Sequence, residues 1–134
     1  MRIMIDTNVL ISAFVLSSPH MQQLVNLIAE RHTIVLPTYV LEELKLVVQR
    51  KFPDKTARLE TFLQELPYEL AYTPQRIDSK RFPIMRDAKD LPVLVTAILE
   101  NVDILLTGDA DFADVSLSHP EVLTPRMFMQ RYGA

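Results

Sequence analysis

The feature that most constrains the fold is a short apolar run near the start of the chain that ends at an acid. Ile3, Met4 and Ile5 form an unbroken apolar triplet, which is typical of a β-strand buried on both faces. Asp6 follows at once, and a second apolar run begins at Val9, so we expect the backbone to pass from strand into helix at this acid. Ligands of open parallel sheets bind beyond the carboxyl ends of the strands. Asp6 is therefore predicted to be either a helix cap or part of a ligand site.

The rest of the chain alternates between strand-like apolar runs and helical patterns. Further strands are predicted over residues 33–36, 69–72, 103–106 and 121–123. Helices are predicted over residues 9–16, 21–31, 38–52, 54–66 and 90–102, and from 125 onward. Thr38 and Asp54 are the expected N-caps of two of these helices. The alternation predicts an α/β layered fold with a parallel sheet, and residues 1–134 are expected to form a single domain.

Composition excludes several classes of protein. Only two of the 134 residues are glycine, and none is cysteine. A glycine-rich phosphate-binding loop is therefore excluded, as are disulfides, thiolate zinc sites and cysteine nucleophiles. The net charge of −3 argues against bulk electrostatic binding to nucleic acid, although an enzyme whose carboxylates hold cations remains compatible with it. Because no apolar run approaches the roughly 18 residues of a membrane span, we expect a cytoplasmic protein without a membrane segment.

Three aspartates occupy positions that meet at one edge of a parallel sheet. Asp6 ends the first strand, Asp90 begins the most apolar helix, and Asp109 follows the strand predicted over 103–106. Strand ends and helix starts share this edge. Each acid alone has a structural interpretation, because aspartate at a strand–helix junction is most often an N-cap and Asp109 follows a turn glycine. The joint arrangement favours a functional site.

A fourth carboxylate is expected from the helix predicted over 38–52, where Glu42 and Glu43 compete. With Leu44 at the centre of the buried face, Glu43 lies about 100° away on its rim, and Glu42 about 160° away in solvent. The helical wheel therefore favours Glu43 as a site residue and Glu42 as a surface charge. The alternative for Glu43 is a charge at the rim with no further role.

Clustered carboxylates are suited to binding a hard divalent cation. Mg²⁺ and Mn²⁺ take oxygen ligands, often one or two carboxylates together with waters and a phosphate. Without a cation, four acids in one place would repel each other, and some would take up protons. A pair of metal ions can lower the pKa of a bound water and stabilise a leaving oxygen. The acids therefore indicate metal-assisted phosphoester chemistry.

The same residues carry a resemblance to the PIN domain, a family of metal-dependent ribonucleases. The family's markers occur in order along nearly the whole chain. They are Asp6-Thr7-Asn8, Glu43-Leu44, Asp87-Ala88-Lys89-Asp90, Thr107-Gly108-Asp109-Ala110-Asp111-Phe112 and the closing Leu123-Thr124-Pro125-Arg126-Met127-Phe128. Each motif is short, and it is their order and spacing that make the combination specific.

The resemblance implies a three-layer α/β/α fold with a parallel sheet of about five strands. It also implies Mg²⁺ or Mn²⁺ bound by four catalytic acids and by Asp111 as an additional ligand. The four acids are Asp6, Glu43, Asp90 and Asp109. Polar positions that support the acids or orient water in the family are matched by Thr7, Asn8 and Thr107, for which helix capping is the alternative.

The function implied by the resemblance is an endoribonuclease that hydrolyses RNA phosphodiester bonds with metal-activated water. Small single-domain members are often VapC-type toxins of type II toxin–antitoxin pairs, which implies an antitoxin protein as a partner and a homodimer. Two alternatives remain: a catalytically silent PIN-like module that binds RNA or protein, and an RNA-processing ribonuclease without an antitoxin. An aspartyl-phosphate phosphatase is disfavoured because Asn8 stands where a second aspartate is expected.

Cations that could guide RNA to the acids are expected just before Asp90. The group consists of Lys80, Arg81, Arg86 and Lys89. Such residues can bind a phosphate backbone, and the alternative is a solvated loop.

Overall fold

Five parallel strands form one sheet in the part of the chain that the computed structural model describes, residues 1–83, 85, 88–108, 112 and 117–133. They are β1 (Arg2–Ile5), β2 (Thr33–Pro37), β3 (Glu69–Ala71), β4 (Ile104–Leu106) and β5 (Glu121–Leu123). Their order is β3-β2-β1-β4-β5, and every neighbouring pair is parallel. The chain therefore moves outward from β1 to β3 and then crosses to the other side of β1. The predicted parallel sheet is confirmed.

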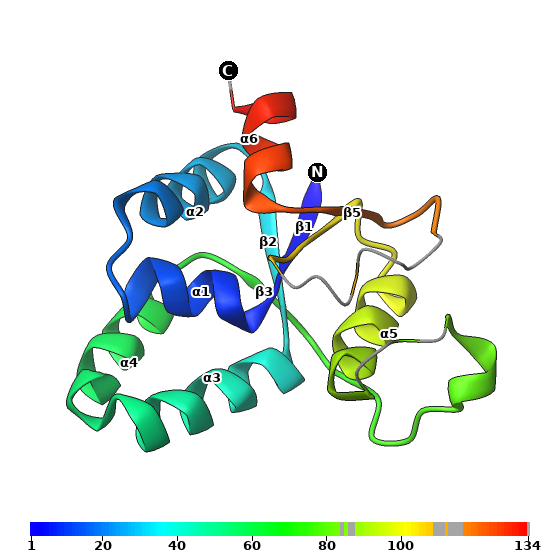
Figure 1. Cartoon of the computed structure of the whole chain (residues 1–134), viewed down its shortest axis with the longest axis horizontal. Coiled ribbons are helices and arrows are strands. Elements are labelled where there is room, and N and C mark those ends of the chain that lie inside the picture. The colour runs from blue at the N-terminus through cyan, green and yellow to red at the C-terminus, as the bar shows by residue number, and fades with distance from the viewer. Residues whose placement is uncertain (84, 86–87, 109–111, 113–116, 134) are drawn as a thin grey trace.

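Six α-helices surround the sheet among the described residues. They are α1 (Thr7–Phe14), α2 (Pro19–Arg31), α3 (Thr38–Lys51), α4 (Thr56–Glu65), α5 (Leu91–Leu99) and α6 (Pro125–Tyr132). Three short 3₁₀ turns are η1 (Pro53–Lys55), η2 (Ser79–Arg81) and η3 (Ala88–Asp90). Figure 1 shows α1 to α4 on one side of the sheet and α5 on the other. Right-handed crossovers explain this layering, because the chain reverses its direction across the sheet before β4.

Both predicted helix caps are wrong. Thr38 is the first residue of α3 and makes no cap; its hydroxyl oxygen instead accepts a hydrogen bond from the Thr73 amide at 3.0 Å. Asp54 lies inside η1, and α4 begins only after Lys55. In both places the helix begins at a different residue from the one that the local sequence suggests, so the polar side chain is not at the N-cap.

The central strand β1 forms the middle of the core. Ile3, Met4 and Ile5 have no exposed surface, because β1 lies between β2 and β4 and helices cover both faces. The most apolar helix, α5, is buried from Val93 to Ala97. None of the helices in the described part is long and apolar enough to cross a membrane.

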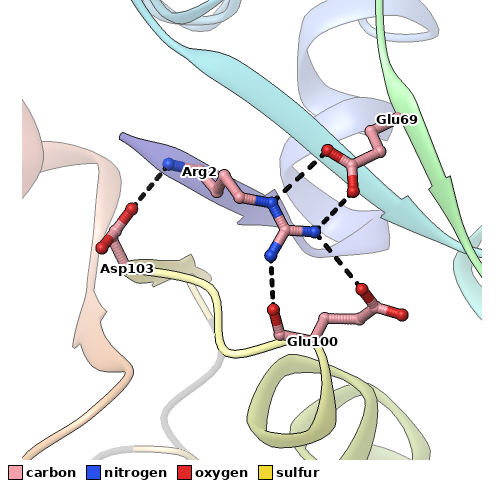
Figure 2. Close-up of polar contacts among 4 residues, drawn as sticks. All are labelled: Arg2, Glu69, Glu100 and Asp103. Atoms are coloured by element: carbon pink, nitrogen blue, oxygen red, sulfur yellow. Dashed lines mark hydrogen bonds and ion pairs between the residues drawn. The ribbon is translucent and has the colours of Figure 1, made fainter.

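Arg2 joins three segments at the amino end of the sheet, as Figure 2 shows. Its guanidinium donates to both carboxylate oxygens of Glu69 on β3, at 2.6 and 3.4 Å. It also donates to the main-chain and side-chain oxygens of Glu100, just after α5. The Arg2 amide donates to Asp103 at 2.7 Å. The hydrogen bond with Glu69 is the largest cause that raises the pKa of Arg2 above its ordinary value. This cluster stabilises the end of the sheet that lies away from the strands' carboxyl ends.

The Arg2→Ala substitution is expected to lower the free energy of unfolding by about 1–2 kcal/mol, because it removes several charge-assisted hydrogen bonds at once. Arg2→Lys is expected to recover only part of this, since lysine cannot make the two-pronged contact with Glu69. Urea denaturation measures both. The control is Arg81→Ala, whose pair with Asp78 is 82% and 58% exposed, and which is expected to change stability by less than about 0.5 kcal/mol. Equal losses in the two alanine variants would show that the Arg2 cluster adds nothing beyond a surface pair.

Candidate active site

Asp6 lies at the point where the strand order of the sheet reverses, between β1 and β4. The register of β1 and β4 places Ile5 beside Leu106, so the next residues, Asp6 and Thr107, leave the sheet side by side. From β1 the chain proceeds to one side of the sheet, and it later returns to form β4 on the other side. In open parallel sheets, ligands bind in the crevice at this point of reversal.

The carboxylate of Asp6 is buried and held from two strand ends. Its side chain is 5% exposed. Oδ1 accepts a hydrogen bond from the Thr7 amide at 2.8 Å, and Oδ2 accepts one from the Thr107 hydroxyl at 2.8 Å. The Asp6 amide donates to the Leu106 carbonyl at 3.0 Å. These contacts fix the carboxylate's orientation.

Helix capping explains only part of this arrangement. Asp6 is the N-cap of α1, but its side chain binds the first amide of the helix, whereas a cap usually binds the second or third. The bond from Thr107 comes from another strand, 101 residues away. A capping aspartate needs no such partner. The geometry therefore favours a functional role for the Asp6 carboxylate in addition to helix capping.

Thr7 and Asn8, the predicted supporting residues next to Asp6, have different environments. The Thr7 hydroxyl oxygen is buried and makes no hydrogen bond to any residue that the structure describes. A buried polar atom without a partner is costly and uncommon, so this oxygen is suited to a water or ion beside Asp6. Asn8 is exposed and lines an open cavity.

The two glutamates of α3 differ in burial as the helical wheel predicts. Glu42 is exposed and Glu43 half-buried. Both line a shallow cavity of about 320 Å³ that also includes Lys89. The Tyr39 hydroxyl donates to the Lys89 carbonyl at 3.1 Å, which ties α3 to the turn that precedes Asp90. Glu43 and Asp90 therefore belong to segments that are in contact.

Asp90 is in the position expected of a helix cap but does not act as one. It directly precedes α5 and is half-buried, and its side chain makes no capping hydrogen bond to the helix. The capping interpretation, which is the main structural alternative for this residue, therefore does not describe its side chain.

The metal site remains a prediction. Asp109 and Asp111, two of the five predicted ligands, lie outside the described residues, as do Arg86 and Asp87. No group of three or more His, Cys, Asp or Glu side chains in the described ranges is close enough to hold a metal. The remaining candidates, Asp6, Glu43 and Asp90, offer only oxygen atoms, which are the donors that Mg²⁺ and Mn²⁺ prefer.

Arg126 is a cation that was not among the predicted site residues. Arg126 lines the same cavity as Asn8 and Gly108, and the last of these directly follows Thr107. The signal for it was present, because Arg126 comes two residues after Thr124, the N-cap of α6 at the end of the last strand. By contrast, Arg81 in the predicted basic group is paired with Asp78 at 3.7 Å.

Removing the Thr107 hydroxyl is expected to weaken the site without unfolding the chain. Thr107→Val keeps the shape of the side chain but removes the donor to Asp6 Oδ2, so the carboxylate loses one of its two anchors. Loss of such an orienting contact commonly costs about 10–100-fold in metal affinity or activity. Metal titration by calorimetry measures the effect, with Thr107→Ser as the control that restores the donor. Equal metal binding by the valine and serine variants would contradict a supporting role for Thr107.

Comparison with known proteins places these features in context. The PIN domain family matches residues 2–111 of the chain. No curated protein sequence matches it significantly. One similar solved structure is VapBC2 from Rickettsia felis bound to a DNA fragment from its promoter, with a TM-score of 0.72, 21% identity, and 92% of this chain and 98% of the other covered. Another is DNA-bound VapBC from Salmonella typhimurium, with a TM-score of 0.68, 16% identity, and 93% and 98% covered. At these identities the likeness concerns the fold.

Proposed function

The chain belongs to the PIN domain family, and on this basis we propose that it is a metal-dependent endoribonuclease acting as the toxin of a type II toxin–antitoxin pair. The observation that carries the nuclease proposal is the Asp6 carboxylate, which is buried at the reversal point of the sheet and bound by Thr107 from the neighbouring strand end. The family resemblance of the flanking motifs supports the same reaction.

The proposed reaction is hydrolysis of an RNA phosphodiester bond. Water attacks phosphorus in line, the bond to the leaving oxygen breaks, and that oxygen takes up a proton. Mg²⁺ or Mn²⁺, when bound, would lower the pKa of a water and offset phosphate charge. The proposed ligands are Asp6, Asp90 and Asp109, with Asp111 as an additional one. Glu43 is proposed to bind the metal through water or to accept a proton from the attacking water.

The toxin proposal is supported by the two VapBC structures, because each matches over nearly the full length of both chains. We infer from this likeness an antitoxin protein as a partner and, from the family, a homodimer. A silent RNA- or protein-binding module and a processing ribonuclease without an antitoxin remain the alternatives. A small antitoxin gene directly beside this gene would favour the toxin over both.

The nuclease proposal is tested by two neighbouring glutamates with different expected roles. Glu43→Gln is expected to lower the rate of cleavage of single-stranded RNA by about 10²-fold or more, as loss of a proton-transfer group does. Glu42→Gln removes the same charge one residue earlier, from an exposed position, and is expected to leave the rate within about twofold of wild type. Cleavage is followed with Mg²⁺, with Mn²⁺ and with a chelator. Equal rates in both variants, or cleavage unaffected by the chelator, would contradict the proposal.

A further inference from the structure

A cavity of about 420 Å³ opens near Asp6, and it is lined by residues that follow three strand ends and by residues of α1 and α2. Two of its lining residues are close in the chain to the Asp6 site: Asn8 is at the start of α1, two residues after Asp6, and Gly108 directly follows Thr107. Thr124 and Arg126 reach it from the segment that follows β5. Because β1, β4 and β5 are parallel neighbours, their carboxyl ends bring these residues together. Its volume is in the range of small-ligand sites.

The cavity combines one positive charge with polar and apolar walls. Arg126 is its only charged lining residue among those that the structure describes. The ion pairs found among the described residues involve other side chains. Ser12 and Thr124 contribute hydroxyls, while Val9 and Met21 contribute apolar surface. A guanidinium matches the geometry of a phosphate, and an apolar wall with a few polar groups suits a ribose and base.

Gly108 leaves this cavity open. A Cβ atom added there would meet no other atom within 4 Å, and the backbone of Gly108 does not have a positive φ. A larger side chain at this position is therefore compatible with the backbone and would project into open space. This gives a way to fill the cavity without removing any of its polar groups.

We propose that this cavity binds the nucleotide next to the scissile phosphodiester, with Arg126 contacting its phosphate. The inference rests on the proposed nuclease function and adds a substrate-binding residue to it. Asn8, for which the family resemblance implies support of the acids or of a water, also lines this cavity with Ser12 and is placed to contact the ribose or base.

The experiment measures binding of a short fluorescent single-stranded RNA in the Asp6→Asn background, so that cleavage does not interfere. Arg126→Gln is expected to weaken binding by about tenfold or more, since it removes a charge-assisted hydrogen bond. A plot of log affinity against log salt concentration should be less steep for this variant than for its parent. The expected difference in slope is about 0.7, the value for one lost phosphate contact on a single strand. Arg131→Gln is the matched control, because Arg131 is on the same helix but pairs with Glu121 outside the cavity. It is expected to change affinity by less than about twofold.

Filling the cavity provides an independent test. Gly108→Val and Ser12→Leu are each expected to weaken RNA binding by about tenfold while thermal melting shows a folded protein. Equal losses in Arg126→Gln and Arg131→Gln, or full binding by both filled variants, would overturn the cavity proposal alone if the Asp6→Asn protein still binds RNA and the wild-type protein cleaves it. Absence of RNA binding by the Asp6→Asn protein, together with absence of cleavage by the wild type, would overturn this proposal and the nuclease function alike.

Discussion

Replacing Asp6 with asparagine is expected to lower RNA cleavage by at least about 10³-fold, which corresponds to about 4 kcal/mol of lost transition-state stabilisation. The reason is the loss of a negative charge from a buried carboxylate that two strand ends hold at the reversal point of the strand order. The side-chain oxygen of asparagine can still accept the hydrogen bond from the main-chain N–H of Thr7. Its side-chain NH₂ group can donate a hydrogen bond to the hydroxyl oxygen of Thr107. The fold is therefore expected to remain, and the lost activity would report on the charge.

Calorimetric titration of Mn²⁺, run beside the cleavage assay, identifies what the charge does. Metal binding is expected to disappear together with cleavage. Asp103→Asn is the control, because Asp103 binds the Arg2 amide at the opposite end of the sheet and should matter only for stability. Unchanged cleavage by Asp6→Asn would identify Asp6 as a helix cap. Metal binding by wild type without cleavage of any RNA would favour the silent binding module.

Most of the fold could be predicted because its strands are short, apolar and separated by helical patterns. The triplet from Ile3 to Ile5 needs burial on both faces, and only a central strand of a layered sheet provides it. The helix ends were harder to predict, because tertiary contacts decide them. The hydroxyl of Thr38 binds Thr73 in a segment 35 residues away. The apolar helix predicted to 102 ends at Leu99, and Asn101 has a left-handed backbone with φ of 51°.

The site was partly predictable for the same topological reason. Asp6 and Thr107 each follow a strand, and the parallel pairing of β1 with β4 brings them into contact. Thr124 follows Leu123 at the end of the last strand in the same way, and Arg126, two residues later, lines the cavity together with Asn8 and Gly108. The basic group expected before Asp90 stays a prediction, because one of its members, Arg86, lies outside the described residues.

Truncating Phe128 is expected to have the largest effect on stability. Phe128 is fully buried on α6. Its ring packs edge-on against His32, with a centroid distance of 6.2 Å, and is tilted against the ring of Tyr132, with a centroid distance of 5.2 Å. Phe128→Ala leaves a cavity in the core and is expected to lower the free energy of unfolding by about 3–5 kcal/mol. A domain of this size is stable by only about 5–15 kcal/mol, so urea denaturation should show a large shift of the midpoint.

The matched control is Met127→Ala, one residue earlier on the same helix, where the side chain is 41% exposed. It is expected to cost less than about 1 kcal/mol, because little apolar surface leaves water there on folding. Since Phe128 anchors the helix that carries Arg126, partial loosening of α6 should weaken RNA binding before global unfolding occurs. Phe128→Leu, which keeps most of the buried volume, is then expected to restore both stability and binding. Similar losses of stability in Phe128→Ala and Met127→Ala would mean that α6 is held by its surface contacts, and that the position of Arg126 does not depend on the core.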